Sequence, residues 1–215
     1  MINDNIVVNK VRDLLMEDEY VASHDFYHLD RVYNNVVAIC TAENIPEKDA
    51  LISSLAALMH DISQKKVSYL QYSEHEYDSA EKARLILEKL DVDPEVIKDV
   101  ERCIIEHRAS KGIKSPILSV QILQDADRLD ALGALAIART FSYDSNRPIY
   151  LPDVPPKENY DGISLSSMNH IVEKILNLKP EAFNTKTAQK IAENRLKFVE
   201  VFVKEFFLEW DGKDI

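Results

Sequence analysis

Glycine and cysteine are scarce in this sequence, and its cysteines form no pattern that would crosslink a small fold. Only four of the 215 residues are glycine, and folds rich in turns and strands need that residue wherever the backbone takes a positive φ. The two cysteines, Cys40 and Cys103, lie in apolar sequence without CxxC spacing, so we expect reduced thiols in the core of a cytoplasmic protein. With its many Leu, Ala, Glu and Lys residues, the sequence predicts an all-α fold.

Long apolar runs and an excess of positive charge are also missing. No uninterrupted apolar segment approaches the roughly 20 residues of a membrane span, and no apolar N-terminal segment with a basic flank is present. The formal net charge of −11 repels a phosphate backbone, which argues against nucleic acid as a partner. We therefore expect a protein that acts neither on membranes nor on nucleic acids. Small anionic substrates remain compatible, because a metal ion can reverse the sign of charge within one cleft.

Apolar residues recur with the period of a helix along most of the chain. Helices are predicted at about residues 4–18, 25–43, 46–61, 73–90, 93–108, 118–140, 164–178 and 184–210. A chain of this length fits one domain, so we expect a single helical bundle over 1–215, with its core at about 20–140 and the helices of 164–210 packed on it. The last helix carries an apolar stripe that could cover this core or join two copies, so a homodimer is left open.

Residues 142–163, SYDSNRPIYLPDVPPKENYDGI, are the exception to this helical order. The four prolines in the segment rule out a continuous helix. An irregular connection of this length inside a compact domain is usually either functional or mobile. Two interpretations stay open, a lid over a site and a surface excursion without a catalytic role.

Histidine and aspartate are concentrated in three segments, at helix ends or on a helix face. These are SHDFYHLDRV with His24, Asp25 and His28, MHDISQ with His60 and Asp61, and LQDADRLDALGA with Asp125, Asp127 and Asp130. Buried carboxylates are costly unless they are paired or bind a metal. One interpretation is a set of buried ion pairs, in which Arg31 and Arg128 neutralise two of the acids. The other is a mixed nitrogen and oxygen site for Mn²⁺, Fe²⁺, Co²⁺ or Zn²⁺, which the three segments taken together favour.

The order of these residues resembles that of the HD-domain superfamily of metal-dependent phosphohydrolases, which is a His, a His-Asp doublet and a distant Asp. The matching positions are His28, His60, Asp61 and Asp127. The resemblance implies a helical bundle in which these four side chains hold one divalent ion, with Mn²⁺ favoured and Fe, Co, Ni, Zn and Mg as alternatives. It aligns Asp127 rather than Asp125 with the distant Asp, which leaves Asp125, Arg31 and Arg128 as candidates for supporting the ligands. With only six histidines in the chain, one ion is favoured over an adjacent pair.

Longer stretches look like a bacterial branch of this superfamily that includes small nucleotide pyrophosphohydrolases. They are HDFYHLDRV, QDADRLDALGALAIART, RPIY and KIAENRLKFVEVFVKEFFLEW, and the resemblance covers nearly the whole chain. It implies cleavage of nucleoside triphosphates to monophosphate and pyrophosphate. The alternatives are a phosphomonoesterase, a phosphodiesterase acting on another nucleotide, and a catalytically weak nucleotide-binding sensor.

One departure from that branch concerns proton transfer. Relatives commonly carry an acid three residues after the Asp of the doublet, where this chain has Gln64. A divalent ion can make water ionise near neutral pH without a dedicated base. We therefore expect Asp61 to act in catalysis together with the ion, and Asp130 or Glu106 to substitute for the missing acid.

Four further side chains are expected to contact the phosphates of a substrate. His24 lies one helical turn before His28, and it could instead cap the start of that helix. His107 ends the helix of 93–108, where the helix dipole alone also favours a cation. Lys65 follows the doublet, and Arg147 in the irregular segment could bind a phosphate with both arms of its guanidinium. His75 and His170 are interpreted as surface or structural residues.

Overall fold

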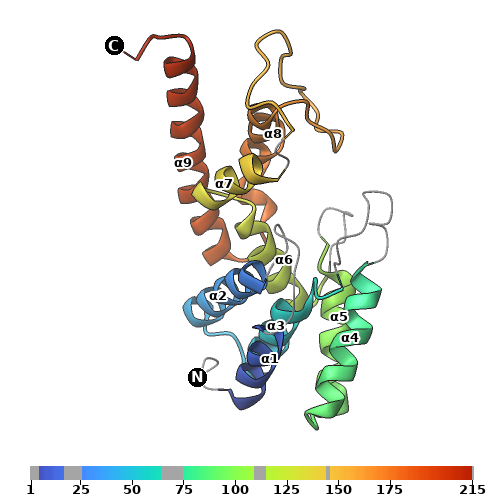
Figure 1. Cartoon of the computed structure of the whole chain (residues 1–215). Coiled ribbons are helices and arrows are strands. Elements are labelled where there is room, and N and C mark those ends of the chain that lie inside the picture. The colour runs from blue at the N-terminus through green and yellow to red at the C-terminus, as the bar shows by residue number, and fades with distance from the viewer. Residues whose placement is uncertain (1–4, 17–25, 64–74, 109–114, 144–145, 215) are drawn as a thin grey trace. The chain divides into compact units, whose positions relative to one another are not determined.

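The computed structural model describes residues 5–16, 26–63, 75–108, 115–143 and 146–214, and within these residues the only regular elements are helices (Figure 1). The α-helices are α1 (Ile6–Met16), α2 (Phe26–Glu43), α3 (Glu47–Met59), α4 (His75–Lys89), α5 (Pro94–Glu106), α6 (Leu118–Asp130), α7 (Ala134–Ser142), α8 (Ser167–Glu173) and α9 (Lys186–Trp210). Two short 3₁₀ turns, η3 (Ile175–Asn177) and η4 (Pro180–Ala182), precede α9. The predicted all-α fold is confirmed. None of the described helices is long and apolar enough to cross a bilayer.

Several of the helices begin at side chains that accept hydrogen bonds from the first turn. Asp93 accepts from the backbone N–H of Glu95 at 2.8 Å, and proline follows it at the first position of α5. The hydroxyl of Thr185 caps α9 in the same way, accepting from the N–H of Ala188 at 3.2 Å. These local signals explain why the predicted starts of the two helices lie within two residues of the observed ones.

The chain divides into two compact units, residues 1–127 and residues 128–215. Each unit is described here by itself. The expectation of one domain over 1–215, with a metal-binding core at about 20–140, stays a prediction.

Helix α3 is the centre of the first unit. It contacts α1, α2, α4 and α5, and every residue from Ile52 to Met59 is buried. The carbonyl of Ser119 on α6 accepts hydrogen bonds from the hydroxyl of Ser53 and the thiol of Cys103, both at 3.3 Å. Because α3 is enclosed on several sides, the two residues that follow it are held in the interior: His60 is 0% and Asp61 5% exposed.

The predicted continuous helix over 118–140 is wrong. Helix α6 ends at Asp130, and α7 begins at Ala134 after a turn that ends in Gly133. Gly133 has φ 83° and ψ −160°, a conformation that is essentially restricted to glycine. The side chain of Arg195 on α9 also lies close, since a Cβ at Gly133 would be 3.2 Å from its Cγ. The apolar period continues through the turn, so periodicity alone concealed the break.

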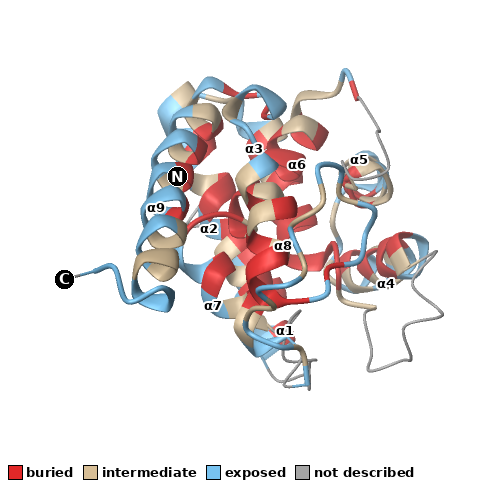
Figure 2. Ribbon diagram, turned by 90° about the horizontal axis from the view of Figure 1, so that it is seen from above, coloured by how far each residue is buried: buried red, intermediate tan, exposed pale blue. Residues whose placement is uncertain are grey.

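Helix α9 is exposed over much of its surface and is buried along one stripe (Figure 2). The buried residues are Ala188, Ala192, Leu196 and Val199, which recur at three- and four-residue steps as in any amphipathic helix. The stripe expected from the sequence, Ile191, Arg195, Phe198, Phe202 and Phe206, is only partly buried, and Phe198 is 50% exposed. Whether a second copy also binds there stays a prediction.

Ser142, the first residue of the irregular segment, still belongs to α7, and residues 146–163 contain no helix or strand, in agreement with the prolines. The segment is hydrogen-bonded to the start of α8, where the N–H groups of Ser167 and Met168 each donate at 2.9 Å, to the carbonyls of Pro148 and Ile149 respectively. Further along, the backbone N–H of Lys157 donates to the carboxylate of Glu173 at 2.9 Å. These hydrogen bonds attach the segment to α8, and both interpretations, a lid and a surface excursion, stay open.

Candidate metal centre

The end of α3 fixes which nitrogen of His60 faces the interior. Its Nδ1 lies 2.8 Å from the carbonyl of Ala57, and because a carbonyl can only accept, Nδ1 carries the proton. In the neutral ring, Nε2 then presents a lone pair. This atom is buried and has no hydrogen-bond partner among the described residues. A buried lone pair of this kind suits a metal ion, so the residue fits the divalent ion that the sequence led us to expect.

Helices α2 and α6 bring His28 and Asp127 to the same place. The Oδ1 atom of Asp127 lies 3.6 Å from Nε2 of His28 and 3.8 Å from Nε2 of His60. Donors bound to one ion at about 2.1 Å lie about 3.0–3.4 Å from each other, so small side-chain movements would bring these atoms to binding distance. Asp127 is also the most exposed of the three, with 37% of its side chain exposed.

Asp61 places its two carboxylate oxygens against different histidines. Its Oδ2 lies 3.7 Å from Nε2 of His60 and 4.0 Å from Nε2 of His28. Its Oδ1 lies 3.3 Å from Nε2 of His75 and 3.8 Å from Nε2 of His107. All six residues of the cluster, these five and Asp127, belong to the first unit and come from five helices or their ends.

His107 repeats the geometry of His60 at the end of α5. Its Nδ1 donates to the carbonyl of Ile104 at 2.6 Å, which again leaves Nε2 as the lone-pair atom. Burial lowers the pKa of the imidazole, and the nearby His60 lowers it further. The neutral ring is therefore favoured, which is the form that binds a metal. The structure brings this residue, expected as a phosphate contact, into the cluster itself.

His75 and its neighbour Glu76 were missed as site residues by the sequence reasoning. His75 begins α4 with a side chain only 11% exposed, and Glu76 is 2% exposed. The available signal was the helical period, because Glu76 falls on the same face as the buried Ala80, Ala83 and Leu87. A carboxylate on a buried face requires a cationic or hydrogen-bonding partner, which should have drawn attention to this helix start.

The remaining acids of α6 have other surroundings. Asp125 is fully buried and lies two residues from Asp127, on another side of the helix. Asp130 is buried in the second unit, where its carboxylate lies 2.6 Å from Nη1 of Arg139. Asp127 is the acid of this helix that reaches the histidines. The catalytic role expected of Asp130 and the supporting role expected of Asp125 stay predictions.

The expected cationic residues are distributed as follows. Arg128 donates to the carbonyl of Ala182 and lies over the ring of Phe183. Arg147, also in the second unit, lies over the ring of Tyr143 at 5.5 Å. Arg31 is half-buried on α2. Their expected roles at the site stay predictions, and His24, Gln64 and Lys65 lie outside the described residues.

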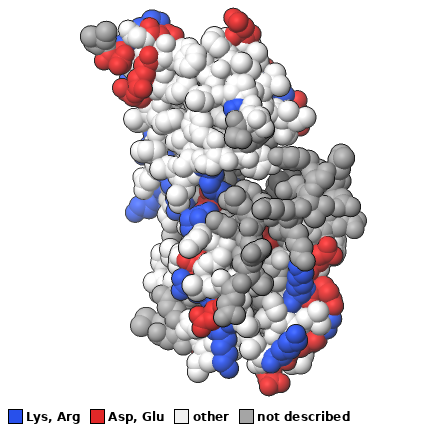
Figure 3. Space-filling model, viewed as in Figure 1, with Lys and Arg blue, Asp and Glu red and all other residues white. Residues whose placement is uncertain are grey.

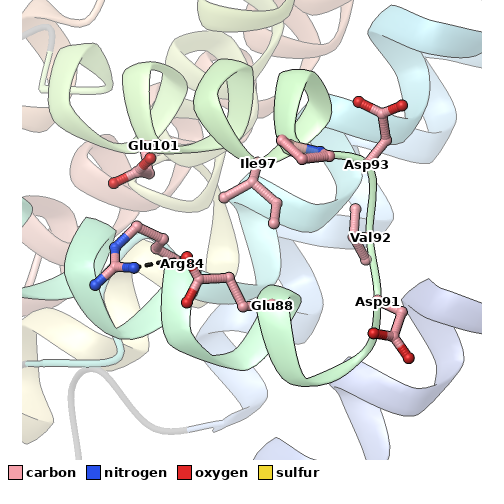
Figure 4. A pocket seen from close by; sticks show the side chains of 8 residues that line it. Arg84, Glu88, Asp91, Val92, Asp93, Ile97 and Glu101 are labelled. Atoms are coloured by element: carbon pink, nitrogen blue, oxygen red, sulfur yellow. Dashed lines mark hydrogen bonds and ion pairs between the residues drawn. The ribbon is translucent and has the colours of Figure 1, made fainter.

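A groove between α4 and α5 shares no residue with the cluster (Figure 4). Its lining consists of Arg84, Glu88, Asp91, Val92, Asp93, Pro94, Ile97 and Glu101. The guanidinium of Arg84 already pairs with Glu81 and Glu88, and burial raises the pKa of Glu101. An acidic groove whose cation is engaged in this way is unsuited to phosphate.

A helical protein whose core gathers imidazoles and carboxylates in this way is suited to hold a divalent ion. The family model described as "HD domain" matches residues 25–132, which include the whole cluster. This chain belongs to the HD-domain family and is a metal-dependent hydrolase of that superfamily.

Individual relatives agree with this family. The uncharacterized protein YpgQ of Bacillus subtilis is 31% identical over 95% of this chain and 92% of its own. The crystal structure of an HD-superfamily hydrolase from Bacillus thuringiensis has 33% identity and a TM-score of 0.70, covering 95% of each chain. The crystal structure of B. subtilis YpgQ in complex with ADP has 25% identity in the structural alignment and a TM-score of 0.69, covering 96% of this chain and 100% of that one.

Proposed function

We propose that this protein hydrolyses nucleoside triphosphates to nucleoside monophosphate and pyrophosphate, with Mn²⁺ as the favoured ion. The observation that carries the proposal is the convergence of His28, His60, Asp61 and Asp127 on one place in the first unit. The ADP complex of the relative YpgQ supports a nucleotide with a phosphoanhydride bond as the ligand.

The residues of the cluster have separate tasks in this reaction. His28, His60, Asp61 and Asp127 would hold the ion, which when bound lowers the pKa of water and withdraws charge from phosphorus. The backbone carbonyl of Ala57 keeps the proton of His60 on Nδ1, so Nε2 stays available as a donor. The apolar residues of α3 exclude water behind the site, which strengthens every electrostatic interaction within it. Contacts of His24, Lys65 and Arg147 with the phosphates are part of the proposal.

The test is product analysis with the full chain, stripped of metal and reloaded with Mn²⁺. Separate nucleoside mono-, di- and triphosphates are incubated, and pyrophosphate and orthophosphate are assayed individually. Mn²⁺-dependent pyrophosphate release from triphosphates supports the proposal. Orthophosphate from monophosphates would instead indicate a phosphomonoesterase. No product with metal still bound would indicate a phosphodiesterase with another substrate or a nucleotide-binding sensor.

The Asp61→Asn substitution tests the assignment of the metal ligands. We expect loss of bound Mn²⁺ and a fall in hydrolysis of more than about 100-fold, because even changes behind metal ligands cost 10–100-fold. Helix content by circular dichroism should stay near that of the wild type. The control is Asp153→Asn, the same change at an exposed position in the second unit, which should leave both quantities unchanged. Full metal content in Asp61→Asn would contradict the assignment of the site.

A further inference from the structure

We propose that Asn35 on α2 is a positioning residue of the metal centre, which holds α6 in the one rotation that turns Asp127 toward the histidines. The side-chain amide of Asn35 donates from Nδ2 to the backbone carbonyl of Ala126 at 2.9 Å, and Ala126 directly precedes Asp127. All three residues belong to the first unit. The inference rests on the proposed metal-dependent function and adds to it a residue that does not itself bind the ion.

The burial of Asn35 is the first argument. The residue is 9% exposed, and Val32, Val36 and Ile39 are buried around it on the same helix. Burying an amide costs free energy unless it is hydrogen-bonded, and an apolar side chain would serve packing alone at this position. The hydrogen bond joins Asn35 to a carbonyl 91 residues away in the chain. The amide therefore links α2 to α6.

The place of Asn35 on α2 is the second argument. It follows His28 by two helical turns, so the two side chains lie on the same face of the helix. His28 approaches α6 as well, with its Nε2 atom 3.6 Å from Oδ1 of Asp127. The helices α2 and α6 are thus joined at two places, once between candidate ligands and once by the amide beside them. A second attachment removes the freedom to turn that a single one would leave.

The alternation of acids on α6 shows why its rotation matters. Asp125 and Asp127 are two residues apart, which places them about 200° apart around the helix. Asp125 is fully buried, and Asp127 is the acid that lies 3.6 Å from His28 and 3.8 Å from His60. A functional site must be held to within about 0.5 Å. A small rotation of α6 would therefore move Asp127 out of reach of a shared ion.

Other hydrogen bonds attach α6 to helices that do not carry His28. The carbonyl of Ser119 accepts from Ser53 on α3 and from Cys103 on α5. The side-chain amide of Gln124 donates to the carbonyl of Glu106 on α5 at 2.9 Å. These bonds remain when Asn35 is replaced, so we expect its variants to fold. The loss should fall on the alignment of α6 with α2.

The test is the affinity of the full, chelator-treated chain for Mn²⁺, measured by isothermal titration calorimetry. Asn35→Leu removes the amide donor and keeps a side chain of similar size. We expect the dissociation constant to rise by about 10–100-fold, as it does when a residue behind a metal ligand is lost. The matched control is Asn34→Leu, the same change at the exposed neighbour, whose amide reaches Asp30 on its own helix at 3.4 Å. This control should bind Mn²⁺ as the wild type does.

A second variant, Asn35→Ser, removes the same hydrogen bond without adding apolar volume, and it should weaken Mn²⁺ binding in the same direction. Urea unfolding in the presence of chelator measures the structural contribution of Asn35 separately. A role in packing alone would lower this stability and leave the affinity for Mn²⁺ unchanged. A positioning role changes the affinity in chains that are still folded.

Wild-type affinity for Mn²⁺ in folded Asn35→Leu and Asn35→Ser would overturn the inference, and so would an equal loss in Asn34→Leu. Weakened Mn²⁺ binding in the Asn35 variants, with no nucleotide cleaved by the wild type, would contradict the proposed function but not this inference. Pyrophosphate release by the wild type, with unchanged Mn²⁺ binding in both Asn35 variants, would do the opposite.

Discussion

At the residue scale, helix ends decide which nitrogen of a site histidine can bind a metal. His60 and His107 each follow the last residue of a helix, and each donates from Nδ1 to the carbonyl three residues before it. Carbonyls of a last helical turn have no i+4 backbone N–H to accept from and so keep acceptor capacity, and a histidine at that position finds an acceptor that keeps its proton on Nδ1. In both residues Nε2 is then left as the lone-pair atom, so the same local chemistry produces two potential donors.

The half-buried His170 gives a pH dependence that does not involve the metal. Burial, together with Lys174 and Arg147, lowers its pKa from 6.5 to about 4. Between these values the unfolded chain binds a proton that the folded chain does not, so stability falls as the pH falls. We expect His170→Asn to lose less stability than the wild type between pH 7 and pH 5, by about 1 kcal/mol after allowing for solvent screening. Urea unfolding at both pH values measures this, and equal losses would contradict the assignment.

The two cysteines should be unreactive in the folded protein. Both are buried and free, and burial, aided by Asp49 and Glu43, raises the pKa of Cys40 to about 12. Burial also raises the pKa of Cys103, and the thiolate is the reactive form. We expect no modification of either by iodoacetamide at pH 7.5, and modification of both in guanidinium chloride, as read by mass spectrometry. Rapid native labelling of Cys103 would contradict its placement.

At the element scale, the turn between α6 and α7 depends on a single glycine. Gly133→Ala forces a side chain into a backbone conformation that costs about 1–3 kcal/mol, and the new Cβ would also press on Arg195 at 3.2 Å. We expect the free energy of unfolding to fall by about 2 kcal/mol. The control is Gly212→Ala near the described end of the chain, which also has a positive φ of 63° but has nothing within 4 Å of the new atom, so it should cost less than Gly133→Ala. An equal, small effect of both substitutions would contradict the role given to Gly133.

Most charged side chains of α4 and α5 lie on the surface, and a few ionisable side chains are buried. On the face shown in Figure 3, basic and acidic side chains are interspersed over these helices, in agreement with the pairs of Arg84 with Glu81 and Glu88 and of Arg102 with Glu106. Exposed pairs of this kind contribute little to stability. Glu76, in contrast, is buried beside His75 and Arg108, so its removal should affect the site more than the surface pairs do.

At the scale of the whole molecule, metal binding should raise the thermal stability of the folded chain. An ion that binds only the folded chain adds about 2.7 kcal/mol at a concentration 100 times its dissociation constant. For a chain of this size we expect the midpoint of thermal unfolding to rise by about 5–10 °C on adding Mn²⁺ to chelator-treated protein. Asp61→Asn should lose this rise and Asp153→Asn should keep it. An unchanged midpoint in the wild type would contradict a metal centre in the folded core.

The all-α fold could be predicted from the sequence, and so could the candidate ligands His28, His60, Asp61 and Asp127. The helical period and the scarcity of glycine are signals carried by the sequence itself, and the helical fold that they predict is present in the structure. The order of His28, the His60 and Asp61 doublet, and Asp127 indicated the family, which the comparison confirms. The break at Gly133 could not be predicted, because the residues around it keep an apolar period and its conformation is set by the turn itself and by Arg195.

What the sequence alone determined is therefore what depends on neighbours along the chain: helices, their caps, and the family's pattern of His and Asp. Only the tertiary structure decided that His75 and His107 face the second oxygen of Asp61. That arrangement depends on α3, α4 and α5 packing together in the first unit, and on Ser63 fixing the start of α4. Residues far apart in sequence meet through packing, and no local signal encodes the distance between them.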